Sequence, residues 1–187
     1  MPAAQRATST LLASLGLGLL GGCSSGSGPA TTSAPEPTYQ TLVALDGWSS
    51  VSRSDDPFIE NVAAAPVCVG PGFYLEQQYH WLEIDTGLCN WVTLSGGADS
   101  AVAKGQMLQL TVSHYDLTAA APAEAELGLT LDDCEAWSKT IPIPSEAAVY
   151  KEQFASPCGL PERGSVLFHL NNHGQNTYQL QDLSSLR

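Results

Sequence analysis

Alternation of apolar and polar side chains with a period of two constrains the fold of this chain more than any other feature. In residues 123–131, AEAELGLTL, every second position is apolar: Ala125, Leu127, Leu129 and Leu131. Successive side chains of a β-strand point to opposite faces, so this spacing gathers the leucines on one face and the glutamates on the other. The segment is therefore predicted to be a strand with one buried face.

Three further segments show the same alternation, at residues 81–86, 107–115 and 166–173. Turn-forming residues separate such segments, as at VGPG, residues 69–72, and at HGQN, residues 173–176. Strands joined by tight turns, without a sustained helical stripe, predict an all-β fold and more narrowly an antiparallel β-sandwich.

The N-terminal residues resemble a bacterial lipoprotein signal. The apolar run at residues 11–20 is shorter than the about 20 residues that a transmembrane helix needs, and LGGC, which contains Cys23, follows at its end. This arrangement resembles the lipobox, in which the signal is removed before the cysteine and the cysteine carries lipid. The resemblance implies a signal peptide at residues 1–22 and a membrane anchor at Cys23. Because Ser24 rather than an aspartate follows, we expect a location in the bacterial cell envelope at the outer membrane, on its periplasmic or its surface face.

Residues 23–38 differ in composition from the rest of the chain. After Cys23 this stretch is rich in Ser, Gly, Thr, Ala and Pro and has no apolar spacing, so it is predicted to be a flexible linker. If Cys23 is not lipidated, residues 1–22 are an ordinary secretory signal. In either case residues 39–187 remain, which is the usual size of one domain with its own core.

The acidic composition limits the expected partners. Lys and Arg total 7 and Asp and Glu total 19, which gives a formal net charge of −12 at pH 7. Such a surface repels phosphate backbones, and we therefore expect no nucleic-acid partner.

An even number of cysteines follows Cys23, which in an exported protein indicates disulfides. They are Cys68, Cys89, Cys134 and Cys158. Three pairings are open, and we favour Cys68 with Cys89 and Cys134 with Cys158 because each pair closes a local loop. A zinc site is the alternative, although the cysteines lack C-x₂-C spacing and an oxidising compartment disfavours free thiolates.

The C-terminal half of the chain resembles the galactose-binding-like jelly roll, a superfamily that includes many carbohydrate-binding modules. The resemblance spans about residues 100–187 and rests on these features: Lys104-Gly105 before a core strand, Pro157, and Tyr178 with Asp182-Leu183 near the end. It implies a jelly-roll β-sandwich, carbohydrate binding and a structural calcium ion, although the closing aspartate is single here. The whole chain also resembles bacterial lipoproteins of uncharacterised role that end in a similar histidine- and asparagine-rich segment.

The polar segment FHLNNHGQNTYQL, residues 168–180, is the strongest candidate for a binding site. Its turn residues predict first of all a β-hairpin between strands at 166–172 and 177–183. A saccharide site also needs planar amides for the hydroxyls and an aromatic face for the apolar C–H groups. The predicted ligand-binding residues are Asn171, Asn172, His173, Gln175, Asn176, Tyr178, His114 and Trp81.

The histidines give no defined metal site. His169 and His173 lie four positions apart, which along a strand separates them by about 13 Å. Because Zn–N bonds are about 2 Å long, a shared zinc ion requires a turn between them or a histidine from another strand, His80 or His114. A structural calcium ion would instead use loop oxygens. The candidates for that role are Asp46, Asp55, Asp56 and Asp182.

The sequence carries no catalytic motif of the common kinds. G-x-S-x-G, H-E-x-x-H and the P-loop are absent, and no spacing of carboxylates singles out a glycosidase pair. We therefore expect a non-catalytic module that binds carbohydrate or another polar ligand. The alternative is a structural lipoprotein that binds another envelope protein, which predicts an exposed apolar patch.

Overall fold

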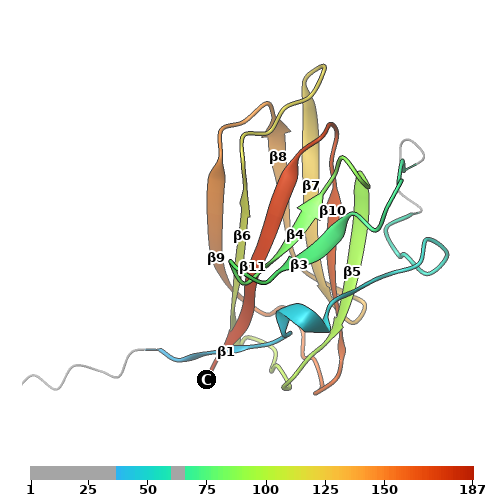
Figure 1. Ribbon diagram of the computed structural model, residues 1–187. Coiled ribbons are helices and arrows are strands. Elements are labelled where there is room, and N and C mark those ends of the chain that lie inside the picture. Colours follow the sequence, from blue (N-terminus) through green and yellow to red (C-terminus); the bar gives the residue numbers. More distant parts are fainter. Residues whose placement is uncertain (1–36, 60–65) are drawn as a thin grey trace, which may run out of the picture. The chain divides into compact units, whose positions relative to one another are not determined.

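Two β-sheets make up the described part of the chain, residues 37–59 and 66–187, in the computed structural model (Figure 1). The predicted signal peptide, Cys23 and nearly all of the linker lie outside these residues. Within the described ranges, no helix is long and apolar enough to cross a membrane.

All strand pairings in the two sheets are antiparallel. Sheet A has the order β3 (Phe73–Glu76), β4 (Trp81–Asp85), β11 (Thr177–Leu186), β6 (Met107–His114) and β9 (Ala148–Ala155), and β1 (Tyr39–Thr41) also pairs with β11. Sheet B has the order β2 (Ser49–Ser50), β5 (Trp91–Gly97), β10 (Ser165–Asn171), β7 (Ala123–Leu131) and β8 (Cys134–Ile143). A short 3₁₀ helix, η1 (Leu45–Gly47), lies between β1 and β2. The predicted antiparallel β-sandwich of jelly-roll type is confirmed.

The core lies between the sheets and follows the predicted alternation. On β7, Leu127 is 2% exposed and Leu129 is 0% exposed, and both face the core. Burying a leucine side chain stabilises a fold by roughly 1.5–3 kcal/mol. The other strands contribute the apolar residues that were predicted to face inward: Leu82, Ile84, Leu108, Leu110, Val112, Val166, Phe168 and Leu170.

Residues 168–180 do not form the predicted hairpin. β10 pairs with β5 and β7 in sheet B, whereas β11 pairs with β4 and β6 in sheet A. The segment 172–176 is thus an arch that carries the chain from one sheet to the other (Figure 1). Gly174, with a φ of 92°, lets the chain reverse, but a reversal does not decide whether the flanking strands pair with each other. The hairpin prediction is therefore wrong.

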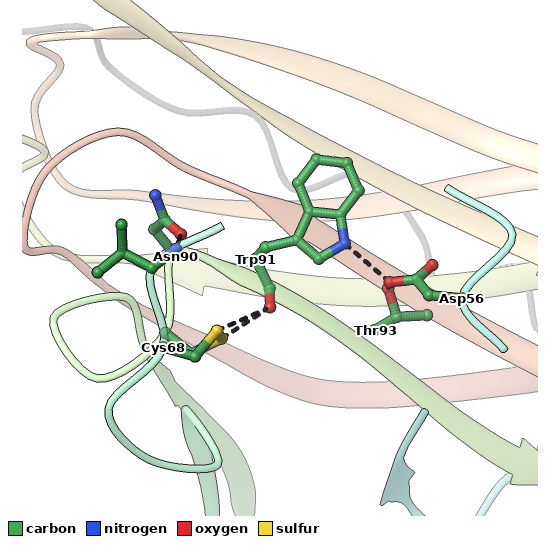
Figure 2. The surroundings of a disulfide bond; sticks show 7 residues. Asp56, Cys68, Asn90, Trp91 and Thr93 are labelled. Carbon is green, nitrogen blue, oxygen red and sulfur yellow. Dashed lines mark hydrogen bonds between the residues drawn. A yellow bond between two sulfur atoms is a disulfide. The ribbon is translucent and has the colours of Figure 1, made fainter. Parts of the chain in front are cut away.

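Two disulfides join the cysteines in the pairs that the sequence favoured. Cys68 bonds to Cys89, which ties the segment before β3 to the segment between β4 and β5 (Figure 2). Cys134, the first residue of β8, bonds to Cys158 in the loop after β9. The second disulfide therefore links sheet B to a loop that leaves sheet A.

Candidate ligand-binding face

Two of the predicted ligand-binding side chains at the arch are fully buried. Asn172 and Tyr178 are each 0% exposed. The Tyr178 hydroxyl donates a hydrogen bond to Asn172 Oδ1 at 2.7 Å, and Asn172 Nδ2 donates to Thr86 Oγ1 at 2.9 Å. Burial raises the pKa of the Tyr178 hydroxyl above its ordinary value, so the hydroxyl keeps its proton and remains a donor. These side chains present no surface to a ligand, and their hydrogen bonds hold the arch in place.

Asn176 is buried as well and ties the arch to the loop after β6. Its Nδ2 donates to Thr118 O at 3.1 Å, and Thr118 N donates in return to Asn176 Oδ1 at 2.8 Å. The backbone N–H of Asn176 donates to Thr86 Oγ1 at 2.9 Å. Thr86 therefore joins the asparagines at both ends of the arch, and their predicted ligand-binding role is replaced by a structural one.

His114 also has its hydrogen bonds within the protein. It is 2% exposed. Its Nδ1 lies 2.7 Å from Tyr115 O, and its Nε2 lies 3.3 Å from Tyr150 Oη. Both ring nitrogens are therefore paired with groups of sheet A and its loops.

The remaining predicted residues are not brought together. His173 and Gln175 are exposed on the arch. Asn171 lies on sheet B, where its Nδ2 donates to Glu126 Oε2 at 3.2 Å. Trp81 lies on β4 of sheet A. Of the eight candidates, Trp81 and His114 line a common hollow at sheet A.

A network of polar side chains covers the outer face of sheet A, on the side away from the core. Gln181 Nε2 donates to Ser113 Oγ at 2.7 Å. Ser113 Oγ in turn donates to Gln179 Oε1 at 2.8 Å. The network thus connects β11 with β6 across the sheet and fixes the orientation of both amides.

A second network continues across the same face. Gln153 Nε2 donates to Gln109 Oε1 at 3.1 Å, and Gln109 Nε2 donates to Asp182 Oδ2 at 3.3 Å. These bonds connect β9, β6 and β11. We call the residues of the two networks the amide face: Gln109, Ser113, Gln153, Gln179, Gln181 and Asp182.

Aromatic side chains of β3, of β4 and of the turn between them border the amide face. The rings of Tyr79 and Trp81 stack with centroids 4.7 Å apart and an interplanar angle of 14°. Trp81 Nε1 donates to Glu83 Oε2 at 3.3 Å, and the Tyr74 hydroxyl donates to Glu83 Oε1. The hydrogen bond to Glu83 is the main reason why the pKa of Tyr74 rises to about 12. We call Tyr74, Tyr79 and Trp81 the aromatic rim.

The aromatic rim and the amide face are contiguous. Glu83 pairs across the strands with Tyr74 on one side and with Gln179 on the other. A hollow of about 290 Å³ lies beside Trp81, and Gln179, Ser113 and Tyr115 also line it. Tyr115 is 57% exposed, so its ring is accessible from solvent.

Gln179 contributes an unpaired donor to this hollow. Its side chain is 3% exposed, and its Nε2 has no hydrogen-bond partner among the described residues. A buried amide without a partner costs roughly 1–3 kcal/mol, and native proteins therefore rarely keep one without a reason. The hollow thus combines the half-buried indole ring of Trp81 with a wall in which the buried Nε2 atom of Gln179 lacks an acceptor.

A second hollow, of about 310 Å³, lies beside the Cys68–Cys89 disulfide. Its buried carboxylate, Asp56, accepts hydrogen bonds from Trp91 Nε1 and Thr93 Oγ1, each at 2.7 Å (Figure 2). None of the unpartnered buried side-chain atoms found in the described ranges lines this hollow. The buried polar side-chain atoms of this hollow therefore already have hydrogen-bond partners, unlike Gln179 Nε2.

The structure shows no shared metal site for His169 and His173. His169 lies on β10, and His173 is exposed on the arch. Within residues 37–59 and 66–187, no group of three or more His, Cys, Asp or Glu side chains is placed to hold a metal ion. The calcium ion implied by the family resemblance stays a prediction.

The glutamines of the amide face were not predicted from the sequence. Gln109, Gln153, Gln179 and Gln181 alternate with core residues along their strands, and such outward positions are normally solvated. The available signal was their recurrence on several strands close to a tryptophan. Which strands are neighbours was not predictable, so the glutamines could not be gathered into one site.

No protein-family profile and no curated protein sequence matches the chain. Among solved structures, a family 11 carbohydrate-binding module from Clostridium thermocellum in complex with a β-1,3-1,4-mixed-linked tetrasaccharide is similar, with a TM-score of 0.45 and 9% identity over 81% of this chain and 96% of that chain. The module CBM35 from Paenibacillus barcinonensis gives a TM-score of 0.32 and 11% identity over 79% of this chain and 98% of that chain. An arabinose-bound α-L-arabinofuranosidase gives a TM-score of 0.42 and 12% identity over 81% of this chain, which spans only 24% of the enzyme. Similarities at this level concern the fold alone.

Proposed function

We propose that this domain binds a neutral saccharide chain on the amide face and does so without catalysis. The observation that carries the proposal is the unpartnered Gln179 amide, which lies buried in the wall of the hollow beside Trp81. A saccharide hydroxyl accepts a hydrogen bond from such an amide. The apolar C–H face of the same sugar ring packs on an indole, which contributes much of the binding energy of such contacts.

The site is held in place before any ligand binds. Tyr79 stacks on one face of the Trp81 ring, and Glu83 accepts the indole N–H. Gln179 is fixed by the hydrogen bond from Ser113. Binding therefore requires little additional ordering of side chains, which lowers the entropic cost of association.

The charges of the site favour a neutral ligand. Glu83 lies in the aromatic rim and Asp182 in the amide face, and the chain has a net charge of −12. A carboxylated or sulfated sugar is repelled by this field, whereas neutral hydroxyls donate to the carboxylates and accept from the amides.

The location of the protein is part of the proposal. We propose that Cys23 is lipidated and that the linker places the binding face away from the outer membrane of a bacterial cell. The support is the lipobox-like LGGC at the end of an apolar run. Mass spectrometry of the protein from membranes tests it: the N-terminal peptide is expected to begin at acylated Cys23, and an unmodified cysteine would contradict it.

Replacing Trp81 with alanine is expected to weaken saccharide binding at least about tenfold, because the stacking surface and its burial are lost together. Affinity electrophoresis through gels that contain neutral polysaccharides, namely glucans, xylans and mannans, measures this. The wild-type protein is expected to be retarded by at least one of them. No retardation by any neutral polysaccharide would contradict the proposal.

Substitutions at two glutamines distinguish binding at the amide face from binding at the arch in the same assay. Gln179→Leu removes the unpaired donor and is expected to abolish most of the retardation. Gln175→Leu makes the same chemical change at an exposed position on the arch and is expected to have no effect. The reverse result would restore the site that the sequence analysis placed at residues 168–180.

A protein partner in the envelope is the second candidate function. Val67 is 68% exposed, Val69 79% and Leu88 38%. Val69 N donates to Leu88 O at 2.8 Å, so these apolar side chains lie together next to the Cys68–Cys89 disulfide. Exposed apolar patches often mark interaction sites. Crosslinking in intact cells tests this: a product that Val69→Asp removes would support a partner, and the absence of any product would count against one.

A further inference from the structure

A third hollow, with its own recognition chemistry, lies on the outer face of sheet B. Thr93, His169, Gly128 and Ser138 are neighbours across β5, β10, β7 and β8 in one row of the sheet. Gly128 has no side chain, and a hollow of about 180 Å³ lies over it, with His169 and Phe58 among its walls. This hollow is on the opposite sheet from the amide face and is independent of the proposed saccharide site.

Aromatic rings fix His169 in the wall of the hollow. The Phe58 ring stacks on the imidazole with centroids 4.3 Å apart and an interplanar angle of 13°. Trp91 meets it edge-on at 4.5 Å. His169 is 5% exposed, so its orientation is set by the protein.

Hydrogen bonds also fix which nitrogen of His169 carries the proton. Asp56 is an acceptor when ionised, and Thr93 Oγ1 lies 2.7 Å from its Oδ2 and therefore donates to it (Figure 2). The same hydroxyl lies 2.8 Å from His169 Nδ1, and since its own proton is committed to Asp56, the Nδ1–H of His169 must be the donor in this contact. The other nitrogen, Nε2, is then left with a free lone pair, and it has no hydrogen bond among the described residues.

The other polar side chains of the hollow are two carboxylates and the hydroxyls of Thr130 and Ser138, of which Ser138 Oγ donates to Glu135 Oε1 at 2.8 Å. Glu126 and Glu135 line it, and both are exposed to solvent. The Thr130 Oγ1 atom is buried and has no partner within the described ranges. The hollow thus offers carboxylates and a neutral imidazole nitrogen, together with an unsatisfied hydroxyl.

We propose that this hollow binds a protonated organic amine. An ammonium group is a multiple donor with no acceptor, which matches Glu126, Glu135 and the Nε2 atom of His169. The aromatic walls attract a cation through their π-faces and pack on its carbon chain. The volume admits a small organic group, and the described residues show no constellation fit for a metal ion.

The experiment uses n-butylammonium chloride as the probe for the amine and follows the His169 ring nitrogens by ¹⁵N NMR. The amine is expected to shift the Nε2 resonance, because that atom becomes a hydrogen-bond acceptor. The double variant Glu126→Gln with Glu135→Gln is expected to weaken binding at least about tenfold through the loss of charge-assisted hydrogen bonds. Glu124→Gln removes a charge from an outward position of the same strand outside the hollow and is expected to leave the affinity unchanged.

Filling the hollow provides a second variant. A Cβ atom at Gly128 would lie 3.8 Å from Phe58 Cε1 and 3.9 Å from His169 Cβ, which is ordinary van der Waals contact. Gly128→Val, whose two methyl groups extend from that Cβ atom into the hollow, is expected to abolish amine binding without replacing any polar side chain. Glucosamine and Nα-acetyl-lysine methylamide, whose side-chain amine is free, then distinguish an amino sugar from a lysine side chain as the source of the amine. No shift of Nε2 with n-butylammonium, or equal affinity in Gly128→Val, would overturn the proposal.

Discussion

Replacing Asn172 with alanine is expected to lower the free energy of unfolding by about 3 kcal/mol, because it leaves buried polar groups without partners. The Tyr178 hydroxyl loses its acceptor at Asn172 Oδ1, and Thr86 Oγ1 loses the donor at Asn172 Nδ2. Both Asn172 and Tyr178 are fully buried, so water does not replace these bonds. Urea denaturation of the wild-type and variant proteins measures the difference.

The neighbouring asparagine provides the control for this prediction. Asn171 is only half-buried, and its hydrogen bond goes to the exposed Glu126. Asn171→Ala is therefore expected to change the free energy of unfolding by less than about 1 kcal/mol. Equal effects of the two substitutions would show that the arch is not held by the buried network.

Lowering the pH is expected to decrease the free energy of unfolding by roughly 3 kcal/mol through the protonation of His169 alone. Desolvation lowers the pKa of His169 from 6.5 to about 4, although the charge of Asp56 opposes this shift. The unfolded chain binds a proton at this histidine below its ordinary pKa, whereas the folded protein does not until the pH is much lower. The contribution is therefore complete above about pH 6.5 and is lost as the pH falls towards about 4.

Two variants isolate this histidine from the other groups that titrate in the same range. The free energy of unfolding is measured by urea denaturation across this pH range for the wild type, His169→Gln and His173→Gln. The His169→Gln curve is expected to be flatter than that of the wild type, whereas His173→Gln, which changes an exposed histidine of the arch, should run parallel to it. Parallel curves for all three proteins would mean that His169 is solvated.

The faces of the strands were predictable because they depend on local spacing. Leu127 and Leu129 of β7 face the core as their alternation with Gly128 indicated. The disulfide pairing was predicted by the preference for short loops. Both inferences use residues that are close together in the sequence.

The role of residues 168–180 was not predictable from local chemistry. A hairpin and an arch between sheets use the same turn residues, and the difference is that β10 and β11 pair with strands distant in sequence. The asparagines were read as ligand-binding because polar residues near a turn are usually exposed. Here Asn172 and Asn176 instead satisfy buried backbone and side-chain groups of the arch.

Both proposed binding sites depend on features that only the three-dimensional arrangement reveals, namely an amide without a partner and a position without a side chain. Gln179 is distinctive because its Nε2 has no partner in the described part of the chain, although Ser113 bonds its oxygen. Gly128 matters because it leaves room between His169 and Ser138 in the row across sheet B. Neither property follows from residue type or from position along the strand.

The position of the bound saccharide distinguishes a site on the amide face from one on the arch. Two-dimensional ¹H–¹⁵N NMR spectra are recorded during titration with neutral hexasaccharides of glucan, xylan and mannan. The largest changes are expected at the Trp81 indole N–H and at the side-chain amide of Gln179, with the Trp91 indole N–H unaffected. Changes centred on His173 and Gln175 of the arch, or on Trp91, would contradict a saccharide site on the amide face.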